Sequence, residues 1–245
     1  MTRLVTCFLL ASFSLVGMPI GWAQTYRHTA IWLRLAPTYS LNEHWSLMGD
    51  LYYRRQSNPE HDLLNAFYSP LLLAGRAGVG YRTQHWLYTL YPVSHFYTYP
   101  ALGNAADLLR APVPEWRPSV LAEWTLEMPH NSAIRLRAGY EYRIFPNPDL
   151  HDIGRCRARA LWRHGIGQHG YAQVWNETLL YAPPYLPGLT NLFEINRTNL
   201  AAGYALSNRS TVEAGYQFTH RQRRSQIEFD DEHALTMTLF LKFAK

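Results

Sequence analysis

Residues 134–144 read Ile-Arg-Leu-Arg-Ala-Gly-Tyr-Glu-Tyr-Arg-Ile, and their two-residue alternation decides the fold. Even-numbered positions carry apolar or aromatic side chains, whereas odd-numbered positions carry arginine, glutamate or glycine. Because successive side chains of a strand point to opposite faces, the segment predicts a strand with one apolar and one charged face. Its length is about twice that of a common globular strand but matches the ~9–11 tilted residues that cross a bilayer.

The same alternation recurs along the chain. It is clear in 45–54, 73–82, 116–126, 155–162, 197–204, 212–219 and 235–243. Three further segments, 29–38, 86–97 and 171–181, are predicted strands with mixed faces. Eleven strands are therefore expected.

The connections between these strands alternate in length. Short ones are expected near 39–44, 82–85, 128–132, 164–170 and 205–210, and longer ones near 55–70, 98–113, 146–153, 182–192 and 222–232. Alternating short turns and long loops predict an all-β fold, an antiparallel transmembrane β-barrel of about 12 strands with its short turns on the periplasmic side. A β-propeller has a similar repeat length but needs four short strands per blade. A soluble periplasmic β-sandwich that binds a ligand remains an alternative, because its strands also alternate.

The strand count conflicts with the even number that is usual in bacterial single-chain barrels. Either a twelfth strand lies within 56–70 or 98–113, or the N-terminal segment 24–30 starts at the long-loop end. The segment could reach that end by threading the lumen.

Residues 1–23 have the pattern of a secretory signal peptide. Arg3 precedes the apolar run Leu4–Val16, and Gly21-Trp22-Ala23 offers small residues at the cleavage positions. We expect cleavage near Ala23, which leaves 24–245 as a single barrel domain in the bacterial outer membrane. An uncleaved anchor is the alternative, although the run is shorter than the ~20 residues of a spanning helix.

The composition excludes several classes of protein. Aromatic residues make up 14% of the chain and charged residues only 17%, which argues against a disordered polymer. Two cysteines, Cys7 and Cys156, are too few for a disulfide scaffold. Aromatic residues also gather near strand ends, where two membrane-interface girdles are expected. They are Trp45, Tyr53, Tyr81, Trp86, Trp116, Tyr142, Trp162, Tyr204 and Tyr216.

Several stretches resemble a known bacterial family, domain of unknown function 2490. They are Trp32 to Arg54, Arg76-Ala-Gly-Val-Gly-Tyr81, Trp175-Asn-Glu177, Asn196-Arg-Thr-Asn-Leu-Ala-Ala-Gly-Tyr204 and Glu213-Ala-Gly-Tyr216. The resemblance covers most of the chain after residue 23 and implies an outer-membrane β-barrel without implying an activity. Such barrels usually end on an aromatic residue that the barrel-assembly machinery reads, and this chain departs from that pattern after Phe243.

If the apolar positions face lipid, the charged positions face the lumen. They are Arg34, Arg54, Arg76, Arg82, Arg117, Arg135, Arg137, Arg143, Arg155, Arg157, Arg159 and Arg197, with Asp50, Glu123, Glu127, Glu141, Glu177 and Glu213. Of the 23 basic residues of the chain, 21 are arginine, whose planar group binds carboxylates in pairs. Two interpretations are open: a structural arginine–glutamate lattice that fills a narrow barrel, or an electropositive passage for small anions.

No catalytic, cofactor or metal site is expected. An outer-membrane lipid-modifying hydrolase is the enzymatic alternative, with Ser94-His95 and His130-Asn131-Ser132 as the nearest candidates, but neither spacing supplies an oriented base. His164 and His169 lie in a predicted turn and do not predict a metal site. The expected partners are outer-membrane lipid, the barrel-assembly machinery and small anionic solutes. Nucleic acid is not expected, because the arginines are interleaved with apolar residues.

Overall fold

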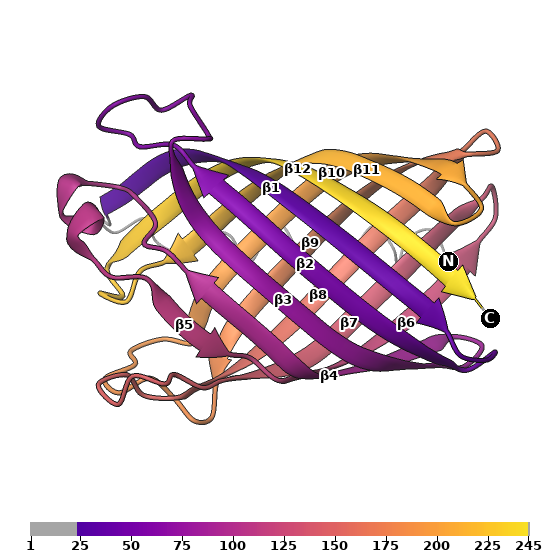
Figure 1. The fold of residues 1–245 in the computed structure, drawn as a ribbon, viewed down its shortest axis with the longest axis horizontal. Helices are drawn as coiled ribbons and strands as arrows, with labels where there is room; N and C mark the ends of the chain where they lie inside the picture. Colours follow the sequence, from indigo (N-terminus) through magenta and orange to yellow (C-terminus); the bar gives the residue numbers. More distant parts are fainter. Residues whose placement is uncertain (1–23, 245) are drawn as a thin grey trace, which may run out of the picture.

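Each of the eleven predicted segments forms a strand in the computed structural model, which describes residues 24–244 (Figure 1). Most of the strands are longer than the alternation suggested, whereas the expected strand 116–126 is divided between two shorter ones. The strands are β1 (Gln24–Ser40), β2 (Trp45–Gln56), β3 (Ser69–Arg82), β4 (Trp86–Thr98), β5 (Val113–Trp116), β6 (Ser119–Met128), β7 (Ser132–Arg143), β8 (Ile153–Ile166), β9 (Gly170–Ala182), β10 (Phe193–Ser207), β11 (Ser210–Gln222) and β12 (Glu228–Ala244).

Eleven of the strands close into one ring. Neighbours follow the chain order from β1 through β4 and then from β6 through β12, and β12 pairs with β1. All neighbouring pairs are antiparallel except β1 and β12, which run parallel from Gln24↔Glu228 to Ser40↔Ala244 (Figure 1). The predicted β-barrel is therefore confirmed. A single closed sheet is neither a two-sheet sandwich nor a propeller.

The twelfth strand, β5, has no ring position of its own. It pairs with β4 at His95↔Trp116, whereas β6 pairs with the same strand from Tyr91↔Ser119 onward. Pro118 lacks the amide hydrogen needed for continuous pairing, so the break between β5 and β6 falls there. β5 continues β6 toward the long-loop end.

The odd number of ring strands follows from the parallel pair. Since β1 and β12 run in the same direction, an even count is not needed for closure. Segment 24–30 begins at the long-loop end, as one alternative predicted, but its expected path through the lumen is wrong. The segment lies in the wall because seventeen paired positions of β12 satisfy its backbone there. Residues 1–23, with the predicted signal peptide, lie outside the described residues.

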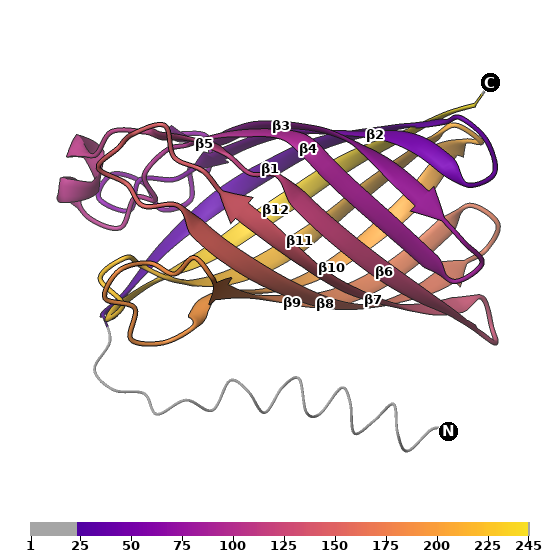
Figure 2. The same ribbon diagram turned by 90° about the horizontal axis from the view of Figure 1, so that it is seen from below.

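The two ends of the barrel differ, as predicted. The turn end carries the connections 41–44, 83–85, 129–131, 167–169 and 208–209. The loop end carries 57–68, 99–112, 144–152, 183–192 and 223–227, with the short 3-10 helix η1 (Ala105–Leu109) in the second of these (Figure 2). Within residues 24–244, no helix is both long enough and apolar enough to cross a membrane.

The outer face of the wall is apolar and exposed. Leu51, Leu200 and Leu235 are 56%, 63% and 66% exposed, whereas the inward positions carry most of the buried charges. This inverts the usual arrangement of a globular protein. Most of the girdle aromatics lie as expected: Trp45, Tyr81, Trp86, Trp162 and Tyr204 near the turn end, and Tyr53, Trp116 and Tyr142 near the loop end. Tyr216 does not, because β11 continues to Gln222 and leaves this tyrosine in mid-strand.

Candidate functional site in the barrel interior

The barrel encloses a cavity of about 760 Å³. Seventeen arginines and eight carboxylates of the described residues line it. Of the eighteen charged residues expected on the inner face, all except Glu127 belong to this lining. Glu127 is exposed near the end of β6 and lines a smaller recess at the turn end with Arg135 and Arg163.

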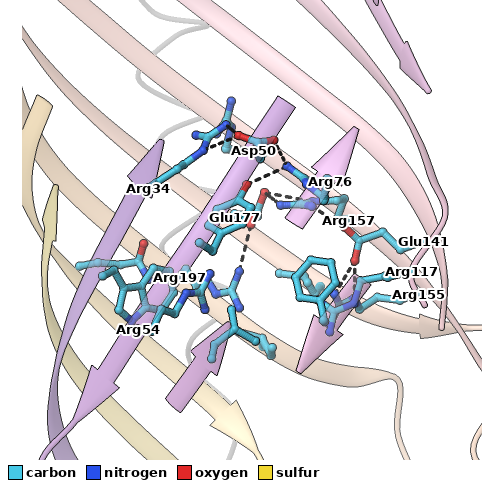
Figure 3. A pocket seen from close by; sticks show the side chains of 18 of the residues that line it. Arg34, Asp50, Arg54, Arg76, Arg117, Glu141, Arg155, Arg157, Glu177 and Arg197 are labelled. Atoms are coloured by element: carbon cyan, nitrogen blue, oxygen red, sulfur yellow. Dashed lines mark hydrogen bonds and ion pairs between the residues drawn. The ribbon is translucent and has the colours of Figure 1, made fainter. Parts of the chain in front are cut away.

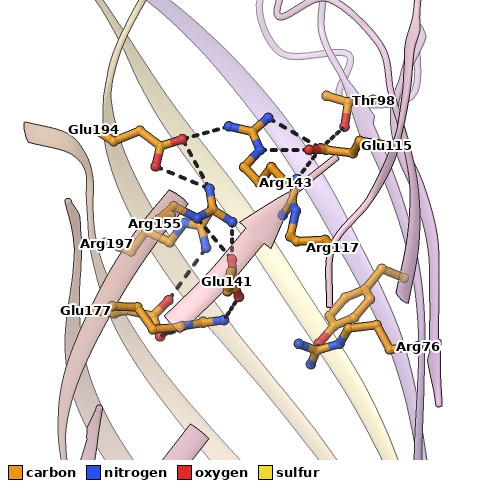
Figure 4. Close-up of polar contacts among 12 residues, drawn as sticks. Arg76, Thr98, Glu115, Arg117, Glu141, Arg143, Arg155, Glu177, Glu194 and Arg197 are labelled. Atoms are coloured by element: carbon orange, nitrogen blue, oxygen red, sulfur yellow. Dashed lines mark hydrogen bonds and ion pairs between the residues drawn. The ribbon is translucent and has the colours of Figure 1, made fainter. Parts of the chain in front are cut away.

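Glu141 forms the centre of an arginine–glutamate lattice (Figure 4). It lies directly opposite Arg155 in the β7–β8 register, and the Nε of Arg155 donates to its Oε2 at 2.9 Å. Arg157, two residues farther along β8, binds the other oxygen of Glu141 and donates to Glu177 at 2.7 Å. Strand register thus brings together side chains from β7, β8 and β9.

A second part of the lattice involves two glutamates that the sequence analysis missed. Arg143 donates to Glu115 at 2.7 Å and to Glu194 at 3.1 Å, and Arg117 also binds Glu115. Glu115 lies one residue before a predicted strand, on the same face as Arg117, so extending the alternation would have found it. Glu194 lies between the expected loop 182–192 and the expected strand 197–204. A bulge between Phe193 and Ile195 turns it inward, which simple alternation does not predict.

Other carboxylates are held in the same manner. Asp50 accepts hydrogen bonds from Arg34 at 2.7 Å and from Arg76 at 2.6 Å. Glu123 likewise accepts from Arg137 at 2.9 Å and from Arg159 at 3.1 Å. Each of these acids is bound by two arginines, which compensates buried charge and leaves the arginines in excess.

Several of the predicted residues lie outside this tight pairing, among them Arg54, which is described below. Within residues 24–244, Arg135 has no carboxylate oxygen within 4 Å, and its Nε is buried without an acceptor. Arg197 is 3.6 Å from Glu177. Glu213 accepts from Tyr171 at 2.7 Å and Gln173 at 2.9 Å, with Arg163 only at 4.0 Å.

Residues 99–112, here called the cap segment, fold over the loop-end mouth. Gln56 of β2 holds this segment by donating to the carbonyl of Pro100 at 2.7 Å and accepting from the amide of Leu102 at 3.0 Å. Ala101 packs against a small apolar cluster that includes Ala30 of β1. The cap segment is therefore anchored to the barrel wall.

A clasp between Asp107 and Arg223 fastens the far side of the cap segment. Arg223, in the connection between β11 and β12, donates to the two oxygens of Asp107 at 3.2 and 3.1 Å and to Asp230 at 2.7 Å. The amide of Gly103 also donates to Asp107 at 2.9 Å. Burial alone would raise the pKa of Asp107, but the hydrogen bonds from Gly103 and Arg223 outweigh it and hold the pKa below its usual value.

Residues 29–230 match the family described as "Protein of unknown function (DUF2490)". The chain belongs to the DUF2490 family. No curated protein matches it. The matched range of this DUF2490 protein contains the whole lattice and the clasp, from Arg34 to Asp230.

The lowered pKa of Asp107 predicts that the clasp of the DUF2490 protein loosens in acid. Since Asp107 has a lower pKa in the closed state than the ~3.9 of a free aspartate, its contribution is complete above about pH 4. The stabilisation from Asp107 is lost as the pH falls through the lowered pKa of its carboxyl group.

A spin label on Leu108→Cys, in a Cys156→Ser background, is expected to be immobile at pH 7 and 5 and to become mobile below about pH 4. The additional substitution Asp107→Asn should make the same spin label mobile at neutral pH.

A label on Leu64→Cys, which is 84% exposed in the loop between β2 and β3, serves as the control. Its mobility should not change between pH 7 and 3. Equal pH profiles at the two positions would show that the clasp does not fasten the cap segment.

The structure places one of the two hydrolase candidates of the DUF2490 protein inside the wall and the other at the turn end. Alternation places Ser94 in the interior, whereas His95 contacts Trp116 edge-on at 5.1 Å. Ser132 Oγ lies 2.8 Å from His164 Nδ1, but within residues 24–244 no carboxylate or amide side chain hydrogen-bonds to His164 to orient it. The described part of the chain also holds no group of three or more histidine, cysteine, aspartate or glutamate residues arranged for a metal.

Proposed function

We propose that this DUF2490 protein is an outer-membrane β-barrel whose lumen is a narrow passive channel that favours small anions. The observation that carries the proposal is the division of the wall into an exposed apolar outer face and an arginine-rich inner face around a cavity. An outer face of this kind is stable in contact with acyl chains. The aromatic residues near both ends and the signal-like pattern of residues 1–23 support the same location.

The preference for anions follows from the charges of the cavity lining. Seventeen arginines face eight carboxylates there, and two more carboxylates, Asp107 and Glu232, contact lining arginines, so ten carboxylates leave an excess of seven positive charges. Such an excess concentrates small anions and repels cations. Because the cap segment narrows the loop-end mouth, we expect small conductance rather than the large currents of wide porins.

A structural role is the second candidate, favoured by the carboxylates that are each held by two arginines. A lattice of this kind stiffens a barrel whether or not ions pass. Planar-bilayer recordings on correctly folded protein separate the two functions. A small anion-selective current supports the channel, whereas the absence of any current, including from Asp107→Asn, leaves the structural role.

Arg135→Glu should reduce or reverse the anion preference of the current. Arg135 is at the turn end of the lumen without a carboxylate partner, so reversing its charge breaks no ion pair. The measurement is the reversal potential in a salt gradient. Arg27→Glu is the matched control, since Arg27 is exposed at the far end of the barrel. If both variants keep the wild-type reversal potential, Arg135 does not face the conducting path.

The proposed location has its own test. Outer-membrane lipid and the barrel-assembly machinery are the partners that such a barrel requires. The protein should fractionate with outer membranes and show faster gel migration before heating than after, as folded barrels do. Recovery of folded protein in water without detergent would contradict the proposal.

A further inference from the structure

We propose that the lumen contains a binding site for the phosphate dianion of a free phosphate or small phosphate monoester. The site is a donor-rich group near the loop end, here called the Arg54 cluster: Arg54, Arg197, Arg221 and Trp32. The inference deepens the proposed function, since the ligand reaches the cluster through the lumen. It names a ligand class and the residues that bind it.

Arg54 is held in place without a counter-charge. It lies opposite Trp32 in the β1–β2 register, and its guanidinium carbon is 3.4 Å from the centroid of the indole ring. Among the described residues, no carboxylate oxygen lies within 4 Å of it, and its buried Nε has no acceptor. Stacking on tryptophan fixes the orientation of the group and leaves its N–H donors free.

The other two arginines are only loosely neutralised. Arg197 also approaches Trp32, at 5.4 Å, and its nearest carboxylate, Glu177 at 3.6 Å, is bound more closely by Arg157. Arg221 lies 3.9 Å from Glu232, whose oxygen also contacts His28 at 3.2 Å.

Unused donors therefore gather in this part of the lumen. The Nε atoms of Arg197 and Arg221 and the indole Nε1 of Trp32 are buried without an acceptor, as is the Nε of Arg54. All four residues line the same cavity. In Figure 3, Arg54 lies beside Arg197, and no dashed line reaches it. The Nε atoms of Arg76, Arg117 and Arg135 are also buried without an acceptor in this cavity, but Arg76 and Arg117 bind Asp50 and Glu115 through their other nitrogens, and Arg135 lies at the turn end. The four donors of the Arg54 cluster lie together without a closely bound carboxylate, which indicates an acceptor-rich ligand.

The charge of the cluster selects the ligand class. The cluster holds three guanidinium groups. Glu232 lies 3.9 Å from Arg221, while Glu177, 3.6 Å from Arg197, is already held by Arg157, so about two positive charges are uncompensated. A dianion balances them. Phosphate adds several acceptor oxygens that match the paired donors of arginine, whereas a halide offers no directional acceptors.

The Arg54 cluster also lies near the loop-end mouth of the barrel, where a solute would enter. Trp32 packs against the same small apolar cluster as Ala101 of the cap segment. A ligand on Arg54 therefore lies just inside the loop-end opening, beneath the cap segment.

Isothermal titration of the detergent-folded protein with inorganic phosphate tests the site. Wild-type protein should bind phosphate saturably, and Arg54→Gln should weaken the affinity about tenfold or more. Arg135→Gln, which removes an unpaired lumen arginine at the other end, should bind like the wild type. Arg54→Lys keeps the charge but loses the paired donors, so its affinity should fall between those of Arg54→Gln and the wild type. Absence of saturable binding, or equal weakening by Arg54→Gln and Arg135→Gln, overturns the site.

Competition experiments identify the source of the phosphate. Glycerol 3-phosphate should displace inorganic phosphate from the wild type, and short-chain phosphatidic acid should not. If only the lipid competes, the free-solute assignment is wrong.

Failure of this inference is distinguishable from failure of the channel. An anion-selective current without phosphate binding overturns the Arg54 cluster alone. Phosphate binding without current supports the cluster and contradicts the passage.

Discussion

Replacement of Glu141 by glutamine is expected to lower the free energy of unfolding by about 3–5 kcal/mol. Glu141 is 2% exposed and binds both Arg155 and Arg157. An amide of the same size keeps the packing but removes the negative charge. Two buried guanidinium groups then each lose one of their two carboxylate partners, leaving Glu194 to Arg155 and Glu177 to Arg157. Breaking one side of a buried ion pair costs far more than the intact pair contributes.

Urea unfolding in detergent micelles, followed by tryptophan fluorescence, measures the effect of Glu141→Gln. Glu127→Gln is the control, because Glu127 is an exposed glutamate on the neighbouring strand and makes no ion pair within the described residues. Its unfolding free energy should remain within about 0.5 kcal/mol of the wild type. Equal stabilities of the two variants would mean that water, rather than the arginines, compensates Glu141.

The second large effect concerns the outer face. Leu200 is the central residue of β10, is 63% exposed and lies on the apolar side of the wall. If that side contacts acyl chains, Leu200→Arg should cost about 2–4 kcal/mol, the cost of an arginine near the bilayer midplane. Reversible folding into phospholipid vesicles against urea measures it. In water, the same substitution at an exposed position would be nearly neutral.

Leu109→Arg is the matched control for Leu200→Arg. Leu109 is 89% exposed at the end of η1, in the cap segment and away from the wall. This variant should fold like the wild type. A loss at Leu109 equal to that at Leu200, or no loss at either position, would contradict contact between β10 and lipid.

The sequence predicted the wall well because alternation is a local property. Arg155, Arg157 and Arg159 repeat at every second residue, so a strand conformation places them on one face whatever its neighbours are. The cavity lining follows from such runs once the strands close into a ring. The prediction failed where the two-residue period is interrupted. The bulge at Glu194 turns this side chain to the inner face, and the alternation in the sequence does not indicate the bulge.

The pairing of residues far apart in the chain was not predictable in the same way. The register between neighbouring strands decides which arginines bind Glu141. The arginines of the Arg54 cluster remain free for the same reason, since their surroundings are built from side chains of four or more strands. Clasp formation between Asp107 and Arg223 joins residues 116 positions apart. No short sequence pattern encodes that contact, because it exists only after the barrel has closed.

The sequence by itself determined the strands, the two faces of the wall and the distinction between its two ends. Tertiary structure alone decided that eleven strands close the ring without a twelfth, that β1 closes it in parallel against β12, and that the cap segment lies at one mouth. The physical reason is that a two-residue period is the same in parallel and antiparallel strands. The direction and partner of the first strand are therefore set by the backbone hydrogen bonds available when the two edges meet.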